Sequence, residues 1–501
     1  MPLLLGDLLR RNAAAVPRRP AAVLGAASLT HLELERASSR LAHAIRGLGL
    51  GRGDRLLCWS RTRLDLLPLF AACAKIGAIF APAGERLGTG EVTELAALAR
   101  PALIVADAPR AEAAASLARA AGVSRLARIG GSAGPGVSLE ERASRASDSP
   151  PDAPDLLETD PHVVFFTSGS TGRPKGVMLS QRTSRLRAML PAGSPRTLSA
   201  FPLSHMAGYA MALGAWTVGG TIWLVERAEG ELLRRELERG AIQRLYCIPA
   251  VWRRVLASSP RPERTGSLRF ADTGTSATPP DLLAAIREAF PQAATRVFYG
   301  STEAGLAALL AEDDVERKPG SVGLPAPGAE LRLAEDGELL VSTDALMEGY
   351  LGDPEASARA LADGWYRSGD LASFDDEGYV TIVGRKREVI RSGGETVAPA
   401  EVEAALEGAP GVRELAVIGL PDERWGEVVC AVVVPEPGAH VSLDRLRAYV
   451  RGRIAAHKEP RALELVAEIP RTHATGQIQR RLLAERVQAA RAPAVPEGGG
   501  R

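Results

Sequence analysis

The chain has 501 residues, of which 46% are hydrophobic and 24% are charged, and its formal net charge is +1. This length is too great for one hydrophobic core, so we expect two or more domains. The near-neutral charge and the interleaving of acidic with basic residues give no electrostatic reason to expect nucleic acid as a partner.

The four cysteines are widely separated and show no paired spacing, which predicts buried core thiols rather than a zinc site or a disulfide framework. They are Cys58, Cys73, Cys247 and Cys430. Residues 1–10 lack a basic leader followed by a long apolar run, so no signal peptide is predicted. No apolar window reaches the length of a membrane span. We therefore expect a cytoplasmic protein with no membrane partner.

Helical and strand patterns alternate in the first part of the chain. Thr30 and Glu33 form a capping-box pattern that predicts a helix ending near residue 49. Further patterns predict strands at residues 55–59, 78–82 and 102–106 and a helix at about residues 65–76. This alternation is typical of βα units on a mostly parallel sheet, so the predicted fold class is α/β. Residues 131–160 are rich in Ser, Pro, Asp and Ala and are expected to form a loose surface connection.

A loop rich in hydroxyls and glycine, residues 167–177, follows a predicted buried strand at residues 163–166. Glycine lets backbone N–H groups approach an anion closely, and Lys175 adds a positive charge. Pro174 and Gly176 stand where the Walker loop has a glycine and a hydroxyl, so this is not a Walker loop. A flexible surface turn has a similar composition. The preceding strand and the lysine favour a phosphate-binding loop, whose candidate ligands are Thr167, Ser168, Gly169, Ser170, Thr171 and Gly172.

A second polar segment follows a predicted strand at residues 296–298 and reads Tyr299-Gly300-Ser301-Thr302-Glu303. Ligands of open α/β sheets bind at the carboxyl ends of strands. Magnesium that accompanies ATP is held by one or two carboxylates and by phosphate oxygens, so Glu303 is a candidate ligand. The alternative interpretation is a glutamate that begins a helix. We favour the metal-binding interpretation.

Two other candidate residues have ordinary structural explanations when each is taken alone. His205, in the segment 201–208, would more often be a structural histidine. Asp370 follows Gly369 and would be interpreted as part of a turn.

These segments together resemble the signatures of the AMP-forming adenylating superfamily, which includes acyl-CoA and aryl-CoA synthetases, adenylation domains and luciferases. The resemblance covers about residues 5–485 and includes five motifs in the family's order. It implies a large N-terminal region of two αβα subdomains plus a small β-barrel, followed by a small mobile α+β C-terminal domain. The expected bounds are residues 1–384 for the AMP-binding domain and 385–490 for the lid. Residues 491–501 are expected to be a disordered tail.

The resemblance also implies roles for individual residues. His205 would pack against the bound acid or gate its access, Tyr299 and Thr302 would position AMP, and Glu303 would bind the metal. Asp370 and Arg385 would reach the ribose, and Arg387 would stand at the hinge. The other residues that it implicates in binding are Gly274, Thr275, Gly300, Ser301, Gly393 and Gly394.

The segment 201–208 disfavours an α-amino acid substrate. The superfamily's amino-acid-activating domains typically carry an Asp after the phenylalanine, to pair with the substrate amine. This chain has Pro202 after Phe201.

One departure from the superfamily's pattern concerns catalysis. The last motif normally ends in a lysine that contacts the substrate carboxylate and the α-phosphate, and this chain has Gln477 there, in a segment one residue longer at His473. Glutamine donates a hydrogen bond but carries no charge. Losing such a group typically costs about 3–4 kcal/mol, or a factor of about 100 to 1,000 in rate. Three alternatives follow: slow adenylation or a substitute cation from His473 or Arg471, activation of another oxyanion such as nitrite, or nucleotide binding without turnover.

The expected function is AMP-forming activation of a carboxylic acid to an acyl adenylate, followed by transfer to coenzyme A. A carrier protein's phosphopantetheine is the alternative acceptor. ATP, Mg²⁺ and coenzyme A are the expected cofactors. The expected catalytic residues are Lys175, His205, Thr302, Glu303 and Gln477.

Overall fold

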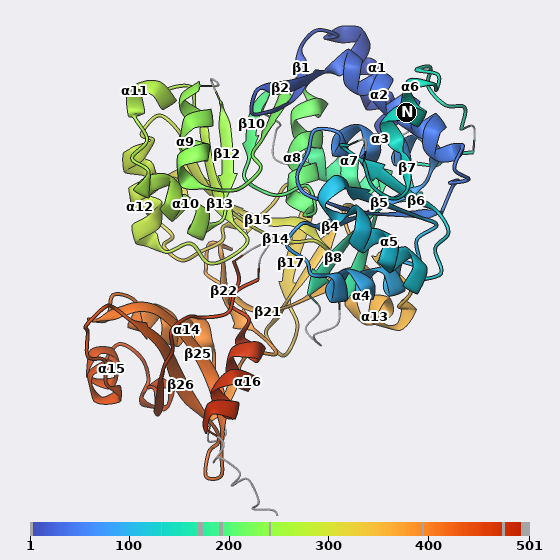
Figure 1. Ribbon diagram of the computed structural model, residues 1–501. Coiled ribbons are helices and arrows are strands. Elements are labelled where there is room, and N and C mark those ends of the chain that lie inside the picture. The colour runs from blue at the N-terminus through green and yellow to red at the C-terminus, as the bar shows by residue number, and fades with distance from the viewer. Residues whose placement is uncertain are drawn as a thin grey trace, which may run out of the picture. The chain divides into compact units, whose positions relative to one another are not determined.

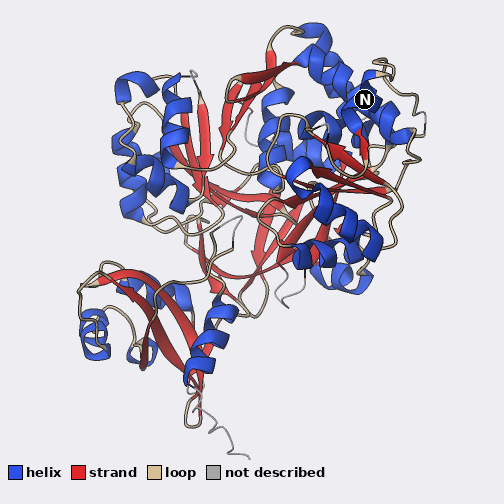
Figure 2. Cartoon of the chain, in the orientation of Figure 1, coloured by secondary structure: helices blue, strands red, loops and turns tan. Residues whose placement is uncertain are grey.

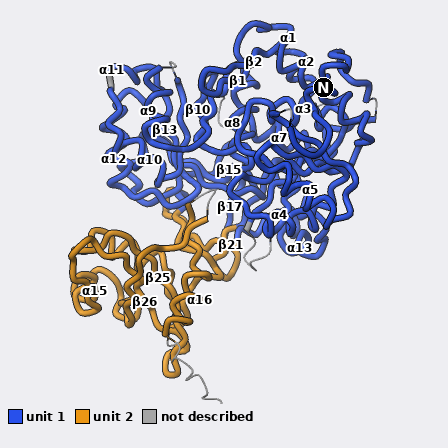
Figure 3. The backbone as a smooth tube through the Cα atoms, viewed as in Figure 1, with its two compact units in different colours: residues 1–332, 340–368, 378–380 blue, residues 333–339, 369–377, 381–501 orange. Residues whose placement is uncertain are grey.

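The computed structural model describes residues 4–131, 133–153, 155–168, 174–189, 194–239, 242–392, 395–472 and 476–491. The chain divides into two compact units, which Figure 3 shows in different colours. Unit 1 consists of residues 1–332, 340–368 and 378–380, and unit 2 of residues 333–339, 369–377 and 381–501.

Unit 1 contains an eight-stranded mixed sheet. Its order is β19 (Gly349–Tyr350), β9 (Pro174–Ser180), β8 (Pro161–Ser168), β4 (Ile79–Gly84), β3 (Arg55–Ser60), β5 (Leu103–Asp107), β6 (Leu126–Ile129) and β7 (Val137–Ser138). The helices near it are α1 (Leu5–Ala15), α2 (His31–Arg46), α3 (Leu66–Ile76), α4 (Thr89–Ala99), α5 (Ala111–Ala120), α6 (Leu139–Ser144), α7 (Gln181–Met189) and α13 (Pro354–Ala360).

The buried side chains of β3 point alternately to two hydrophobic clusters. Leu56 and Cys58 join the cluster that contains α2 and α3, whereas Leu57 and Trp59 join the cluster that contains α4 and α5. Because successive side chains of a strand face opposite sides, helices cover both faces of this sheet (Figure 2). The predicted βα organisation is therefore confirmed.

The predicted ends of α2 and α3 agree with their sequence signals. The Thr30 hydroxyl accepts a hydrogen bond from the backbone of Glu33, whose carboxylate accepts from the Thr30 N–H at 2.8 Å. Gly77 ends α3 in the left-handed conformation, with φ of 72°, which glycine adopts without steric cost.

A nine-stranded mixed sheet forms the rest of the core of unit 1. Its order is β16 (Leu324–Pro325), β15 (Gly305–Leu310), β14 (Ala294–Ser301), β13 (Phe270–Gly274), β12 (Arg244–Cys247), β10 (Arg196–Ser199), β11 (Thr221–Leu224), β1 (Pro20–Leu24) and β2 (Ala27–Thr30). The other helices of this unit are α8 (Met206–Thr217), α9 (Gly230–Arg239), α10 (Pro249–Ala257), α11 (Pro262–Thr265) and α12 (Pro280–Ala289).

Helix α8 packs between the two large sheets (Figure 1). Its residues Tyr209 and Leu213 share one buried cluster with Phe80 of the eight-stranded sheet and Ile222 of the nine-stranded sheet. Residues that immediately precede α8 therefore lie where both sheets can contribute to a site.

A third, five-stranded sheet contains residues of both units. Its order is β17 (Ala329–Leu333), β18 (Glu338–Thr343), β21 (Trp365–Phe374) and β20 (Leu361–Ala362), and β22 (Val380–Arg385) also pairs with β21. Together with the two large mixed sheets, this curled sheet agrees with the expected N-terminal architecture.

Unit 2 has its own small sheet and two apolar clusters, one on each face. The order is β24 (Glu395–Val397), β23 (Ile390–Ser392), β26 (Gly426–Pro435) and β25 (Val412–Asp422), with β27 (Ala462–Leu465) pairing with β26. Helices α14 (Pro399–Leu406) and α15 (Leu443–Val450) contribute to one cluster, and α16 (Arg480–Arg491) contributes to the other. This is the predicted α+β domain.

The connection at residues 131–160 is more ordered than predicted. It contains β7 and α6, and the Ser138 hydroxyl caps α6 by accepting from the Glu141 N–H. Arg40 of α2 donates hydrogen bonds to the backbone carbonyls of Ser144 and Ala146. The expectation of a loose connection was wrong for residues 137–144, because these long-range contacts leave no signal in local composition.

None of the helices in the described part of the chain is long and apolar enough to cross a membrane.

Candidate active site

The candidate phosphate loop joins the two strands of an antiparallel hairpin. Thr167 of β8 lies opposite Lys175 of β9, and Ser168 lies opposite Pro174. The strand-loop-strand arrangement confirms that this is not a Walker loop, in which a helix follows the loop. The candidate ligands at the tip lie outside the described residues; they are Gly169, Ser170, Thr171 and Gly172.

The segment 299–303 forms another tight hairpin, between β14 and β15. Ser301 pairs with Gly305, and the Ser301 hydroxyl accepts a hydrogen bond from the Ala304 N–H at 3.0 Å. A side chain at Gly300 would meet the Gly305 carbonyl oxygen at 2.0 Å, so only glycine fits. Thr302 and Glu303 stand at the turn, and the alternative interpretation of Glu303 as the start of a helix is wrong.

The buried guanidinium of Arg187 in α7 stabilises this turn through hydrogen bonds to backbone carbonyls. It donates to the backbone carbonyls of Thr302 at 2.7 Å and Glu303 at 2.8 Å, and twice to that of Ala345. Burial lowers the pKa of Arg187 to about 10, so it remains charged at neutral pH. Sequence reasoning missed Arg187 because its carbonyl partners lie more than a hundred residues away.

Tyr350 of β19 connects the two hairpins. Its hydroxyl donates to Oε1 of Glu303 at 3.0 Å, and Nζ of Lys175 lies 4.3 Å from the centroid of its ring. Burial and the neighbouring Glu303 raise the pKa of Tyr350 well above its ordinary value, so the hydroxyl keeps its proton. The structure thus brings Lys175 and Glu303 to one tyrosine that sequence reasoning did not single out.

Glu303 fits a magnesium site that is shared with phosphates. Within the described ranges, no group of three or more His, Cys, Asp or Glu side chains could hold a metal ion. Magnesium that accompanies ATP takes one or two protein carboxylates and completes its shell with phosphate oxygens and water. The Glu303 carboxylate, beside the candidate phosphate hairpin, suits that mode of binding.

His205 caps α8 and stacks on an aromatic side chain. Its Nδ1 accepts from the Ala207 N–H at 3.2 Å, which assigns the proton of the neutral ring to Nε2. The ring of Phe201 lies 5.7 Å away and nearly parallel. Burial lowers the pKa of His205 to about 4, so the imidazole is neutral at physiological pH.

Three aromatic side chains extend from His205 to the candidate loop at Gly274 and Thr275. Phe201 contacts Tyr246 at 4.9 Å between ring centroids, and Tyr246 contacts Phe298 at 5.5 Å. The hydroxyl of Tyr246 lies 3.2 Å from that of Thr275, which has the unusual φ of 71°. Non-glycine residues in this conformation carry strain and cluster at functional sites. The structure therefore joins His205 and Thr275 through side chains that the sequence had not connected.

Glycine is required at position 274. A Cβ there would lie 2.1 Å from the Phe298 carbonyl oxygen. Tyr299 directly follows Phe298 on β14, so this chain of contacts also reaches the hairpin that carries Glu303.

In unit 2, Asp370 and Arg385 form an ion pair. Nε of Arg385 lies 2.8 Å from Oδ1 of Asp370, whose side chain is buried while that of Arg385 is half exposed. The neighbouring Lys386 contacts Asp336 at 2.6 Å and Glu338 at 2.9 Å. Gly393 and Gly394 lie outside the described residues.

Gln477 in unit 2 bonds to Thr472 through its backbone. Its N–H donates to the Thr472 hydroxyl at 3.0 Å, and its carbonyl accepts from the Thr472 N–H at 2.7 Å. Arg471 donates to the Gly476 carbonyl oxygen at 3.1 Å. His473 lies outside the described residues.

The α/β architecture and its candidate phosphate hairpin agree with comparisons to known proteins. The chain belongs to the AMP-binding enzyme family: this family matches residues 9–351, and the AMP-binding enzyme C-terminal domain matches residues 401–475. The expected relationship is confirmed.

Two curated relatives extend over nearly the whole chain. A feruloyl-CoA synthase from an Amycolatopsis species is 35% identical over 504 residues, which cover 95% of this chain and 99% of the relative. An indoleacetate–CoA ligase from Aromatoleum aromaticum is 33% identical and covers 95% and 96%, respectively.

A solved structure supports the same family membership. ATP-bound MatB from Rhodopseudomonas palustris has a TM-score of 0.87 at 26% identity and covers 98% of this chain and all of its own. The protein is therefore an adenylate-forming ligase that binds ATP and activates a small-molecule acid.

Proposed function

We propose that this protein is an AMP-forming acid–thiol ligase that converts a carboxylic acid to an acyl adenylate and then to a coenzyme A thioester. The observation that carries this proposal is the convergence of Lys175 and Glu303 on Tyr350. A cation for phosphate and a carboxylate for magnesium, both next to the phosphate hairpin, are the charges that Mg-ATP requires.

The chemistry consists of positioning and charge stabilisation. The acid's carboxylate oxygen attacks the α-phosphorus of ATP, the bond to the β-phosphate oxygen breaks, and pyrophosphate leaves. Lys175 and the hydroxyls of the hairpin, including Thr167 and Ser168, hold the phosphates, while Tyr299 and Thr302 position AMP. Glu303 would hold magnesium, which would neutralise part of the phosphate charge. No covalent enzyme intermediate is involved.

The aromatic contacts around His205 favour an aryl or arylalkanoic acid. Phe201, Tyr246 and Phe298 form an aromatic cluster beside His205, and the neutral imidazole of His205 adds no charge to this environment. The names of the two curated relatives, feruloyl-CoA synthase and indoleacetate–CoA ligase, support the same substrate class. Pro202 follows Phe201 in place of the acidic residue that would pair with an α-amine.

The second half-reaction uses unit 2 in this proposal. Residues 385–490 act as a lid that turns about Arg387, Asp370 and Arg385 bind the ribose, and the loop with Gly393 and Gly394 lines the path of the pantetheine thiol. The thiol attacks the acyl carbon of the adenylate, and AMP leaves. We propose free coenzyme A in the cytoplasm as the thiol, with a carrier protein as the alternative.

Pyrophosphate release from Mg-ATP, with mass detection of products, tests the proposal on a panel of aryl and aliphatic acids with and without coenzyme A. Acid-dependent pyrophosphate and a CoA thioester are expected. A thioester formed only on a phosphopantetheinyl carrier protein would show that the acceptor is the carrier protein and not coenzyme A. Turnover of nitrite with an arylamine, but of no carboxylic acid, would refute acid activation. The absence of pyrophosphate release with every substrate would refute it as well.

A further inference from the structure

The contacts of Tyr350 suggest a role in holding both charges of the nucleotide site. Building on the proposed function, we propose that Tyr350 is a positioning residue: its hydroxyl orients Glu303 for magnesium, and its ring orients Lys175 for phosphate. Nothing in the local sequence around Tyr350 marks it for chemistry.

Tyr350 is itself held in a fixed position. Its backbone pairs with Val177 of β9, two residues after Lys175, and its N–H donates to the Ser357 hydroxyl at 2.8 Å. The residue is only 6% exposed. The side chain of Tyr366 also hydrogen-bonds to it. A ring with these constraints can impose a geometry on flexible neighbours.

Glu303 is constrained at both its backbone and its carboxylate. Arg187 and the Met347 N–H bind its carbonyl oxygen, each at 2.8 Å, and Tyr350 binds Oε1. Both oxygens of a carboxylate carry lone pairs. The hydrogen bond at Oε1 therefore orients the carboxylate and leaves Oε2 to bind a metal ion. Partners of this kind orient ligating carboxylates and strengthen metal binding by about 10- to 100-fold.

Lys175 contacts the Tyr350 ring, and among the described residues no carboxylate pairs with it. A lysine ammonium 4.3 Å from a ring centroid lies in the range of a cation–π interaction. Among the described residues, Lys175 and Glu303 form no ion pair with each other, and each contacts Tyr350 instead. Tyr350 therefore keeps the cation available for phosphate and the carboxylate available for magnesium.

Two variants separate the functions of the hydroxyl and the ring. Tyr350→Phe removes the bond to Glu303 but keeps a ring for Lys175, whereas Tyr350→Leu removes both. Tyr449→Phe is the matched control, because Tyr449 also donates its hydroxyl, at 3.0 Å, but to the backbone carbonyl of Glu407. Thermal unfolding of all variants reports on the fold.

The measurements are binding of Mn²⁺ by electron paramagnetic resonance in the presence of α,β-methylene-ATP, and binding of this nucleotide without metal by calorimetry. Tyr350→Phe should weaken Mn²⁺ binding about 10-fold or more and change metal-free nucleotide binding less than 2-fold. Tyr350→Leu should weaken both. Tyr449→Phe should match the wild type.

Wild-type Mn²⁺ affinity in Tyr350→Phe would overturn the inference, and so would an equal loss of metal and nucleotide binding in that variant. These outcomes are distinct from failure of the proposed function, which would be seen as no acid-dependent pyrophosphate release by the wild-type protein, whatever the Mn²⁺ affinity of the variants.

Discussion

Gln477 carries no charge at the position where related enzymes, by sequence resemblance, carry a lysine. Gln477→Lys should therefore raise the rate of adenylate formation, by a factor of up to about 100 to 1,000 if the ammonium reaches the developing charge. Single-turnover pyrophosphate release measures this rate. Gln479→Lys, which adds the same charge two residues away, is the control and should have little effect. No gain in Gln477→Lys would show that Gln477 does not limit the reaction.

His162 is fully buried at the start of β8, with Nε2 2.7 Å from the Ser184 hydroxyl. Burial lowers its pKa from 6.5 to about 3. Between these values the unfolded chain binds a proton that the folded chain does not, so the free energy of unfolding falls as the pH falls below 6.5. From this group alone the loss is about 2 kcal/mol by pH 5.

Chemical unfolding at pH 7, 6 and 5 checks the contribution of His162. His162→Gln should reduce the dependence of stability on pH, whereas His440→Gln, at an exposed position, should preserve the wild-type slope. If the dependence of stability on pH is unchanged in His162→Gln, His162 is not the source of that dependence. His205, with its pKa of about 4, acts in the same direction and leaves a residual slope.

At the scale of elements, α7 stabilises the hairpin between β14 and β15 through Arg187. Arg187→Met would leave the carbonyls of Thr302 and Ala345 without the Arg187 donor, while the Glu303 carbonyl keeps the Met347 N–H, and each unsatisfied buried group costs about 1–3 kcal/mol. We expect a loss of about 3 kcal/mol or more in the free energy of unfolding, measured with urea, together with weaker Mn²⁺ binding. The partly exposed Arg182→Met on the same helix should change neither property by much, and equal effects of both variants would refute the role of Arg187.

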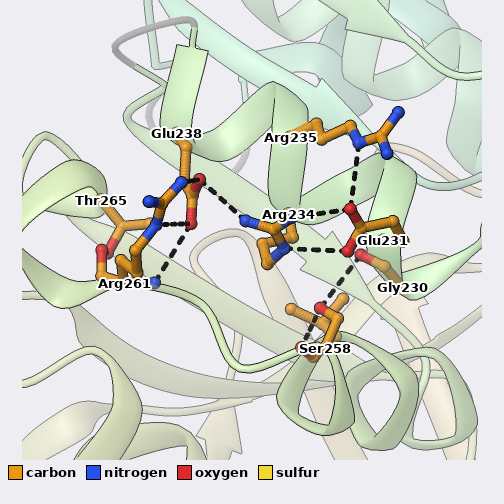
Figure 4. A network of polar contacts seen from close by, with 9 residues as sticks. Gly230, Glu231, Arg234, Arg235, Glu238, Ser258, Arg261 and Thr265 are labelled. Carbon is orange, nitrogen blue, oxygen red and sulfur yellow. Dashed lines mark hydrogen bonds and ion pairs between the residues drawn. The ribbon is translucent and has the colours of Figure 1, made fainter.

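A network of ion pairs connects α9 to the segment between α10 and α11 (Figure 4). Glu238 accepts from Arg234 at 2.9 Å and from Arg261 at 2.6 Å, and Arg234 also binds Glu231. Hydrogen bonds from Arg261 lead the causes that lower the pKa of Glu238 to about 2. Because the folded-state pKa is depressed, this stabilisation is present above about pH 4.5 and is lost as the pH falls through about 2.

Glu238→Gln tests the network by its dependence on pH. The variant should be less stable than the wild type at pH 7, and the difference should shrink as the pH approaches 2. Added salt should also reduce the difference. Thermal unfolding across pH measures both effects, with the exposed Glu229→Gln as the control. A difference that persists at pH 2 would show that packing, not charge, explains the effect.

At the scale of the whole molecule, the sequence predicted the features that depend on contiguous residues. The capping box at Thr30, the non-Walker loop before Lys175 and the polar strand end at Glu303 are all local patterns. Arg187 and Tyr350 could not be predicted, because β19 reaches β9 from more than 150 residues away and an ordinary Gly-Tyr pair marks neither contact. The strand and helix within residues 131–160 were not predicted either, because the contacts that stabilise them come from residues far away in the sequence.

The most direct test of acid activation follows an oxygen atom from the acid. The acid with the fastest pyrophosphate release would be prepared with ¹⁸O in its carboxylate and converted with Mg-ATP and coenzyme A. Attack of the carboxylate on the α-phosphorus predicts one ¹⁸O atom in the AMP released and none in pyrophosphate. Unlabelled AMP, or formation of ADP in place of AMP, would contradict the proposed activation.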